Sequence, residues 1–405
     1  MSRSTLHTAV DLTDLSAWTE DREMDLLAQL RREDPLHWND LPDGDGFWSL
    51  TRYADVRDAA TDATRLSSAQ GTQIVNRKVE GHLTSLHNMD DPQHAALRKV
   101  TISHLRAVKI RQWYDVIENS ARVLIDSAVA HEGTFDLVDV VSAKMPMLVL
   151  AQVLGVPEDE APRMVDWTNN LTSTDPSATV DAEQLAHVRE EVLGYFEKLV
   201  DQRRANPTDD LLSVLVQGKV EGGRPLTWDE IAAYIIMIVA AGNETTRQSL
   251  SGGAISLSAI PGSWQRLATE DGLLDLTIEE MLRHVSPVGS LRRTATEDIE
   301  MHGKTIKKDE KVVLWFSAAN RDPEFFADPE TFVLDRTPNE HLTFGWGVHF
   351  CLGAHLARAE MKEFYAQMIQ RRLQFVVEGK PERLPHQLFR GWSQVPVSVQ
   401  ELRVP

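Results

Sequence analysis

The only cysteine of the chain, Cys351, lies in the stretch FGWGVHFCLG at positions 344–353. A lone thiol is usually inert packing, a thiol beside a base such as His349 can be a nucleophile, and a thiolate can hold an iron cofactor. The nucleophile is disfavoured because residues i and i+2 rarely face each other at hydrogen-bonding distance, and it gives Phe344 no role. The glycines favour a ligand, since they let backbone N–H groups approach the sulfur.

A second polar group interrupts the longest apolar segment. After IAAYIIMIVAA the chain continues with Gly242, Asn243, Glu244 and Thr245. A glycine inside a helix costs ~1 kcal/mol relative to alanine, and a buried acid is costly unless it is paired or solvated. Thr245 can also hydrogen-bond to the carbonyl of Ala241 and bend the helix. Either the helix reaches solvent at Glu244, or an acid and an alcohol border a functional gap; the largely apolar SGGAISLSAI that follows favours the gap.

The third feature is a stretch without acidic residues in a strongly acidic protein. The formal net charge is −19, which disfavours binding to nucleic acid and to anionic membrane surfaces. The charged side chains between positions 92 and 114 are nevertheless all basic: Arg98, Lys99, Arg106, Lys109 and Arg111. These cations either form a docking surface for an acidic partner or belong to an ordinary helix face exposed to solvent.

Helical patterns dominate the elements that must hold these groups. EDEAPRMVDWTNNL begins one helix with acids in its first turn, and DAEQLAHVREEVLGYFEKLVDQRR forms a long amphipathic helix that ends in cations. Short β-like runs occur at GFWSLT, DIEMHGKTI, KVVLWFS and QVPVSVQEL, and they are too few for a large sheet. The sequence therefore predicts a mainly α fold with small β-sheets.

The longest predicted element is a central helix. Thr227 and Glu230 form a capping-box pattern at its start, and Pro261 follows its expected end at Ala259. About 33 residues at ~1.5 Å each span roughly 50 Å. Because a helix of this length crosses the whole molecule, we expect residues 1–405 to form one domain.

The sequence carries no pattern of export or membrane insertion. A single cysteine cannot form an internal disulfide, which suits a reducing compartment. The apolar run 231–242 is shorter than the roughly 20 residues that span a bilayer, and MSRSTLHTAVDLTD lacks the apolar core of a secretory signal. We therefore expect a cytoplasmic protein without membrane insertion.

The cysteine stretch resembles the haem-binding loop of the cytochrome P-450 family, Phe-x-x-Gly-x-His-x-Cys-x-Gly. The matching residues are Phe344, Gly347, His349, Cys351 and Gly353. Further segments resemble family motifs in the family's order: DDPQHAALRKV, a haem-contacting helix; AAGNETT, the oxygen-activation segment; Glu280-x-x-Arg283; RRTATED, a propionate-binding strand; and AANRDPEFFADPETFVLDR, the meander before the haem loop. The matches extend from about Trp48 to Pro396.

The resemblance implies the cytochrome P-450 fold, with a single haem domain and a long central helix. It implies that Cys351 is the axial thiolate ligand to the iron of haem b, which favours cleavage of the O–O bond. It also implies that Glu280 and Arg283 brace the haem loop, with Arg336 as a candidate third member. The other residues that it places at the cofactor are His94, Arg98, Arg293, Phe344, His349, Gly353 and Ala241. The basic ones would meet the haem propionates, and Phe344 would shield the sulfur.

The same resemblance implies a monooxygenase that inserts one oxygen atom from O2 into a hydrophobic small molecule. Glu244 would relay protons and Thr245 would hydrogen-bond to oxygen, which meets the proton demand of O–O cleavage. Electrons would come from a separate ferredoxin system. The basic stretch would attract this acidic partner, and Arg358 and Lys362 would extend it.

The substrate is the least specified part of the resemblance. The implied pocket residues are Met237, Ala240, Val288, Gly289 and Val395, together with the loop 67–88. They are small or apolar, so steroids, terpenoids, alkyl chains and aromatic compounds are the candidate classes, although the same residues could be ordinary core. A haem-thiolate sensor that binds gas or another ligand without turnover, and a haem-free cysteine hydrolase, are the alternatives from other functional classes.

Overall fold

The computed structural model describes residues 10–41, 45–74, 83–172 and 182–404. About 53% of the chain is helical, which confirms the predicted mainly α class with small sheets. The α-helices are α1 (Ser16–Thr19), α2 (Glu23–Glu33), α3 (Tyr53–Thr61), α4 (Gln93–Ile102), α5 (Ala107–Ile110), α6 (Tyr114–Ala130), α7 (Met145–Leu154), α8 (Ala161–Thr172), α9 (Ala182–Ala205), α10 (Leu211–Gln217), α11 (Trp228–Ser258), α12 (Ser263–Thr269), α13 (Leu273–Val285), α14 (Phe316–Ala319) and α15 (Ala354–Gln370). Among the described residues, none of these helices combines the length and apolarity needed to cross a membrane.

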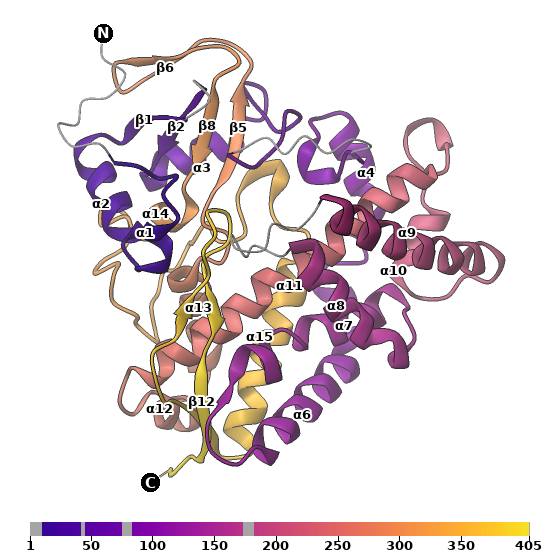
Figure 1. Cartoon of the computed structure of the whole chain (residues 1–405), viewed down its shortest axis with the longest axis vertical. Coiled ribbons are helices and arrows are strands. Elements are labelled where there is room, and N and C mark those ends of the chain that lie inside the picture. The colour runs from indigo at the N-terminus through magenta and orange to yellow at the C-terminus, as the bar shows by residue number, and fades with distance from the viewer. Residues whose placement is uncertain (1–9, 42–44, 75–82, 173–181, 405) are drawn as a thin grey trace.

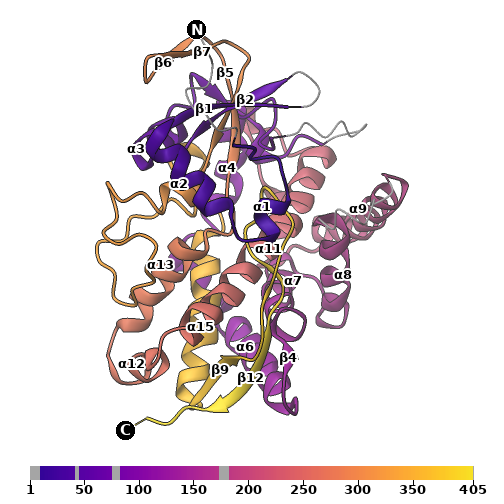
Figure 2. The same ribbon diagram turned by 60° about the vertical axis from the view of Figure 1, so that its left-hand side comes forward.

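The strands form small sheets at opposite ends of the molecule (Figure 2). One sheet has the order β1-β2-β8-β5-β3, and in it β2 and β8 run parallel. The strands are β1 (Leu36–Asp40), β2 (Gly46–Leu50), β3 (Leu66–Ser67), β4 (Phe135–Asp136), β5 (Leu291–Ala295), β6 (Ile299–Met301), β7 (Lys304–Ile306), β8 (Lys311–Leu314), β9 (Leu373–Val377), β10 (Glu382–Arg383), β11 (Trp392–Gln394) and β12 (Pro396–Glu401). A second sheet has the order β4-β12-β9. Each of the four predicted β-like runs contains a strand, but DIEMHGKTI forms two strands, β6 and β7, and the last two residues of KVVLWFS begin α14.

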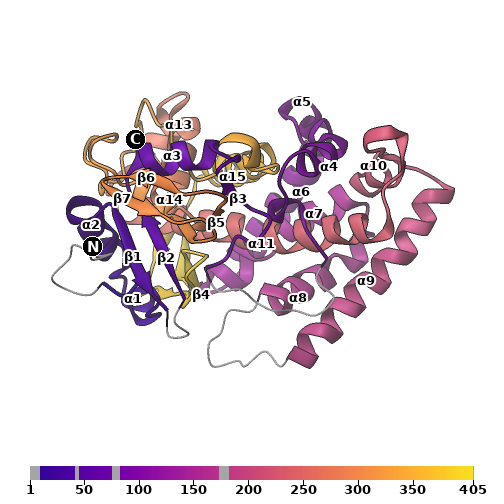
Figure 3. The same ribbon diagram turned by 90° about the horizontal axis from the view of Figure 1, so that it is seen from above.

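The central helix α11 runs from the sheet-rich part, where α1, α2, α3 and α14 also lie, toward α8, α9 and α10 (Figure 3). It spans Trp228–Ser258, so the predicted boundaries hold to within one residue. Thr227 accepts a hydrogen bond from the backbone N–H of Glu230, and the Glu230 carboxylate accepts one from the backbone of Thr227, which completes the expected capping box. At ~1.5 Å per residue the helix is about 46 Å long.

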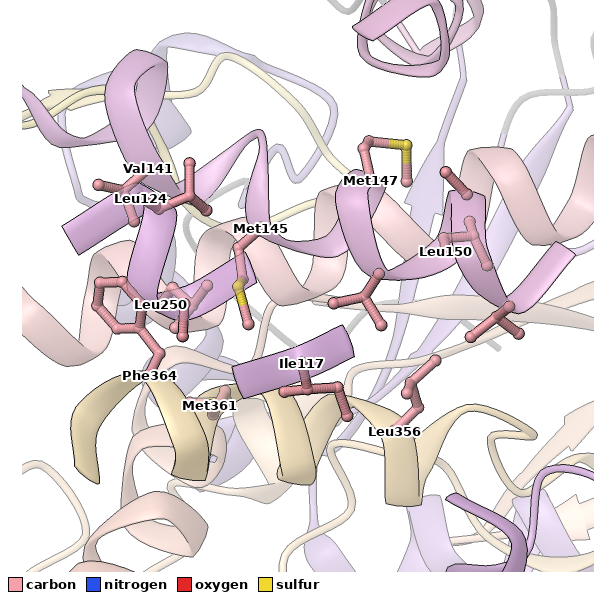
Figure 4. Packing of buried hydrophobic residues seen from close by; sticks show 14 of the residues in the cluster. Ile117, Leu124, Val141, Met145, Met147, Leu150, Leu250, Leu356, Met361 and Phe364 are labelled. Atoms are coloured by element: carbon pink, nitrogen blue, oxygen red, sulfur yellow. The ribbon is translucent and has the colours of Figure 1, made fainter. Parts of the chain in front are cut away.

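The main apolar core lies between α6, α7, α11 and α15 (Figure 4). The residues that pack there are Ile117, Leu124, Val141, Met145, Met147, Leu150, Leu250, Leu356, Met361 and Phe364. The register between α11 and α15 is set by polar contact as well as by packing, because the Tyr365 hydroxyl donates to the carbonyl of Leu250 at 2.7 Å. A Cβ at Gly253 would lie 2.6 Å from that hydroxyl, so glycine permits the close approach. These contacts fix the direction in which the N-terminus of α15 points.

A buried ion network attaches α13 to the segment that precedes the cysteine loop. Glu280 and Arg283 are fully buried, and their closest contact is 2.7 Å. Arg336 adds a second guanidinium at 3.0 Å, as the sequence suggested, and Asn339 donates to the same carboxylate. Arg283 also donates to the backbone carbonyl of Asn320 at 2.7 Å. The network therefore holds the chain from Asn320 to Asn339 in a fixed shape.

Replacing the shared acid should destabilise the fold. In Glu280→Gln, two buried guanidinium groups lose their counter-charge, and breaking a buried ion pair costs about 3–5 kcal/mol. Urea unfolding should show this loss in the free energy of unfolding. The control is Glu270→Gln, which removes the exposed carboxylate that pairs with Arg266 and should leave the unfolding midpoint nearly unchanged. Equal losses in the two variants would contradict a special role for the buried network.

Candidate active site

The cysteine loop is a narrow turn that requires glycine at two points. Gly345 and Gly347 have φ values of 69° and 70°, in the left-handed region that glycine adopts without strain. A Cβ at Gly347 would lie only 2.8 Å from the carbonyl oxygen of Ala60. The backbone N–H of Cys351 donates to the carbonyl of Phe344 at 2.8 Å. The closed turn places the thiol directly before α15.

The environment of the Cys351 sulfur combines burial with positive charge. The residue keeps accessible surface, yet the surrounding protein desolvates the thiol and raises its pKa. The backbone N–H groups of Gly353 and Ala354 and the charges of Arg98 and Arg358 act in the opposite direction. The first turn of α15 thus directs donors at the sulfur. This arrangement suits a thiolate that binds a metal ion.

The middle of α11 keeps accessible surface on one side. Ala241 is exposed, whereas Asn243 and Glu244, two and three positions later, are buried. Met237 and Thr245 lie one helical turn before and after Ala241, and both are only partly buried. This side of α11 therefore presents accessible surface from Met237, Ala241 and Thr245.

The structure brings together the four basic residues that the sequence assigned to a cofactor. His94 and Arg98 come from α4, Arg293 from β5, and His349 from the cysteine loop. The imidazole rings of His94 and His349 lie 4.2 Å apart. Arg98 donates to the carbonyl of Phe350 at 2.5 Å, which turns its guanidinium toward the cysteine loop. The neighbouring Arg292 instead donates to the backbone of the loop at Gly71.

The charges of this group act on one another. The pKa of His349 is lowered to about 3. Burial is the largest cause, and the charges of Arg293, His94 and Arg98 add to it. Burial lowers the pKa of Arg293 to about 10. Asp91 contacts His94 Nδ1 at 3.2 Å, while the buried His94 Nε2 has no hydrogen-bond partner among the described residues. Such a cluster of buried cations and donors suits a ligand with carboxylate groups.

Glu244 and Thr245 make separate contacts on α11. The Thr245 hydroxyl donates to the carbonyl of Ala241 at 3.1 Å, as the sequence predicted. Glu244 Oε1 accepts from Gln248 Nε2 at 2.6 Å, and Glu244 Oε2 lies 3.5 Å from Arg247 Nη1. Sequence reasoning missed Arg247 and Gln248, although their positions at i+3 and i+4 from the acid are a signal for contact on a helix.

The predicted pocket residues differ in how accessible they are. Met237, Ala240 and Val288 are partly buried and keep accessible surface. Gly289 is buried, and its N–H donates to the carbonyl of Leu388. Val395 is fully buried in the main core. Positions 75–82 of the predicted pocket loop lie outside the described residues.

The basic stretch is exposed, but its expected extension is neutralised. Its exposed cations are Lys99, Arg106, Lys109 and Arg111. Arg358 forms a bidentate pair with Glu279 at 2.6 and 2.7 Å, and Lys362 pairs with Asp275 at 2.5 Å. The expectation that Arg358 and Lys362 add charge to this surface is corrected, because α13 packs beside α15 and supplies an acid to each.

Glu279 is a further residue that the sequence did not single out. Burial acts to raise the pKa of the Glu279 carboxyl. Hydrogen bonds from Arg358 and His341 outweigh this effect and lower the pKa to about 2. The paired Arg358 guanidinium lies over the Phe344 ring, 4.4 Å from its centroid. No local pattern reveals this contact, since Glu279 and Arg358 are 79 positions apart.

Comparison with known proteins gives relatives over nearly the whole chain. The methyl-branched lipid omega-hydroxylase of Mycobacterium tuberculosis is 35% identical over 404 residues, covering 96% of this chain and 94% of the relative. Linalool 8-monooxygenase of Pseudomonas putida is 33% identical over 400 residues, covering 96% and 98%.

The architecture and the sequence match the same family. The crystal structure of CYP108D1 from Novosphingobium aromaticivorans has a TM-score of 0.89 at 29% identity, and the match covers 96% of this chain and 97% of that one. The cytochrome P450 family model matches residues 47–397. The resemblance seen in the sequence motifs is thereby confirmed, and the chain belongs to the cytochrome P450 family.

Proposed function

We propose that this cytochrome P450 is a haem-thiolate monooxygenase, formed by residues 1–405 as one haem domain, that hydroxylates apolar small molecules with O2 and electrons from a ferredoxin. The observation that carries the proposal is the Cys351 thiol, which amide N–H groups face in a residue that keeps accessible surface, together with the nearby cluster of basic side chains. A sensor without turnover has less support, because the relatives are named as a hydroxylase and a monooxygenase.

The residues present suit haem b. Cys351 would be the axial thiolate ligand, and His94, Arg98, Arg293 and His349 would hold the propionates. Propionate carboxylates would accept a hydrogen bond from the buried His94 Nε2–H and would compensate the desolvated Arg293 guanidinium. Phe344, Gly353 and Ala241 would make the remaining contacts. When bound, haem supplies the one-electron chemistry and the activation of O2.

On the thiolate side, the protein maintains charge and excludes water. The N–H groups of Gly353 and Ala354 stabilise negative charge on the Cys351 sulfur. Phe344 covers this side of the loop, and the Arg358 guanidinium packs over the Phe344 ring. The cation is thus held near the sulfur without contacting it.

On the opposite side, two residues of α11 would handle protons. Thr245 donates its proton to the Ala241 carbonyl, so its hydroxyl oxygen can accept a hydrogen bond from the open side of the helix. Glu244 Oε2 points toward Arg247, whose side chain is 16% exposed. We assign proton uptake to Glu244 on this partly exposed side, and proton delivery to the Thr245 hydroxyl.

Electrons would arrive at the exposed basic surface. The exposed cations of the basic stretch are Lys99, Arg106, Lys109 and Arg111. The same stretch contains Val108, 76% exposed, and ends at Tyr114, 52% exposed. A cationic surface with apolar side chains suits a transient acidic protein partner such as a ferredoxin.

The substrate class follows from the accessible residues and from the relatives. Met237, Ala240 and Val288 present apolar surface, which favours a hydrophobic ligand. One relative is named for methyl-branched lipids and another for linalool. We propose a branched, apolar hydrocarbon as the substrate of this protein.

Carbon monoxide should report the cysteine ligand. The reduced, haem-loaded protein should give the red-shifted Soret band of thiolate ligation, and Cys351→Ser should lose it, because no other cysteine exists in the chain. Absorption spectra measure the band, and circular dichroism establishes that each protein is folded. A globin-like band in folded wild-type protein would rule out the assignment.

Charge reversal in the basic stretch should slow reduction by a ferredoxin. Lys109→Glu should lower the rate constant, and added salt should slow the wild type, because exposed charges are screened over ~8–10 Å at moderate ionic strength. Stopped-flow absorption measures the rate. The control is Lys308→Glu, an exposed lysine just after β7. If both variants are reduced equally fast, the stretch is only a solvated face.

Loss of the Thr245 hydroxyl should uncouple electron use from product formation. General acid–base help contributes roughly 10²–10⁴-fold, so Thr245→Ala should release a larger share of the electrons as peroxide while the carbon monoxide band is unchanged. Glu244→Gln should enlarge the solvent isotope effect on NADPH consumption. The comparison variant is Thr246→Ala. Uncoupling in that variant, with normal coupling in Thr245→Ala, would place the delivery step at Thr246.

A further inference from the structure

A buried glutamine binds the carboxylate of Glu244 and a distant turn at the same time. Gln248 is fully buried on α11, one turn after Glu244. Its Nε2 donates to Glu244 Oε1 at 2.6 Å and to the carbonyl of Trp392 at 3.2 Å. Its Oε1 accepts from the backbone N–H of Trp392 at 2.7 Å. The side-chain amide of Gln248 thus uses both N–H hydrogens and its carbonyl oxygen, in hydrogen bonds to Glu244 and to the backbone of Trp392.

The turn at Gly391, directly before Trp392 at the start of β11, is shaped to receive this side chain. A Cβ at Gly391 would lie 2.0 Å from Gln248 Oε1, so only glycine allows the approach. The Trp392 ring packs on α11 as well, because a Cβ at Gly252 would meet it at 2.6 Å. Ring and backbone contacts together hold the turn against two successive turns of α11. The position of Gln248 is therefore fixed from outside its own helix.

Glu244 receives its position from this fixed amide. Its Oε1 is bound by Gln248 at 2.6 Å, whereas its Oε2 is only 3.5 Å from Arg247, which is a weaker contact. One carboxylate oxygen is therefore held firmly, and the other remains the adaptable end on the partly exposed side. A group that exchanges protons needs a fixed position, and it needs one oxygen whose contact is long enough to be given up.

We propose that Gln248 is a positioning residue for the proton relay: it anchors Glu244 to the backbone of Trp392 and thereby sets where the carboxylate delivers its proton. The proposal rests on the proposed relay function of Glu244. It predicts that Gln248 affects proton delivery only through Glu244, and not through a general loss of structure.

A double-mutant cycle tests this dependence. Gln248→Met keeps the length of the side chain and removes its hydrogen bonds. It should raise the fraction of NADPH electrons released as peroxide with linalool as the probe, because part of the roughly 10²–10⁴-fold rate enhancement from general acid–base help is lost. It should also shift the C–O stretching frequency of carbon monoxide bound to the reduced protein, a readout that needs no substrate. In the Glu244→Gln background, Gln248→Met should change neither readout further.

The matched control is Gln367→Met. Gln367 is also a buried glutamine whose Nε2 donates to a glutamate four residues earlier and to a backbone carbonyl, but it lies on α15. Gly391→Ala is a second variant in case Gln248→Met folds poorly, because it displaces Gln248 without altering its chemistry.

The outcomes separate the two proposals. The positioning role of Gln248 is wrong if Gln248→Met and Gly391→Ala give the same peroxide yield and C–O stretching frequency as the control Gln367→Met. It is also wrong if their effects add fully to those of Glu244→Gln. If Glu244→Gln itself leaves both readouts at wild-type values, the relay function of Glu244 is wrong, and Gln248 cannot act through it. Both proposals are supported if Gln248→Met alone reproduces the effects of Glu244→Gln and the double variant shows no further change.

Discussion

Ionisation of Cys351 is opposed by the protein around it, because burial raises the pKa of the thiol. A thiolate ligand requires the reverse, so the fold must bring compensating positive charge to the sulfur. Part of it comes from the N–H groups of Gly353 and Ala354, at the start of α15, and part from the side chains of Arg98 and Arg358. Since these groups belong to α4, α15 and the cysteine loop, the site exists only when the three are assembled.

Helix α13 links this assembly to the rest of the fold through two adjacent acids. Glu280 binds Arg283 and Arg336 and so shapes the segment that leads into the cysteine loop. Glu279 binds Arg358 and keeps that guanidinium over Phe344. One acid therefore braces the backbone before the loop, and its neighbour orients a cation beside it. The packing of α15 against α6, α7 and α11 completes the support.

The two sides of the site differ in how their charges are satisfied. On the cofactor side, buried basic groups such as Arg293 and His349 are desolvated next to one another, which lowers the pKa of each. A bound dianion would remove that penalty. On the side of α11, Glu244 is already held by Gln248 and Arg247. The basic cluster would thus be completed by an anionic ligand, whereas Glu244 is held by protein side chains.

Features that depend on near neighbours in the chain could be predicted from the sequence. The capping box of Thr227 and Glu230, the extent of α11, the main strands and the glycine-dependent cysteine loop all follow from local spacing. The motif resemblance also named four basic residues that the structure brings near one another. Contacts between distant segments that no motif covers could not be predicted, because they depend on which surfaces pack together. Packing alone decided that Arg358 is neutralised by α13 and that Gln248 binds Trp392, 144 positions away.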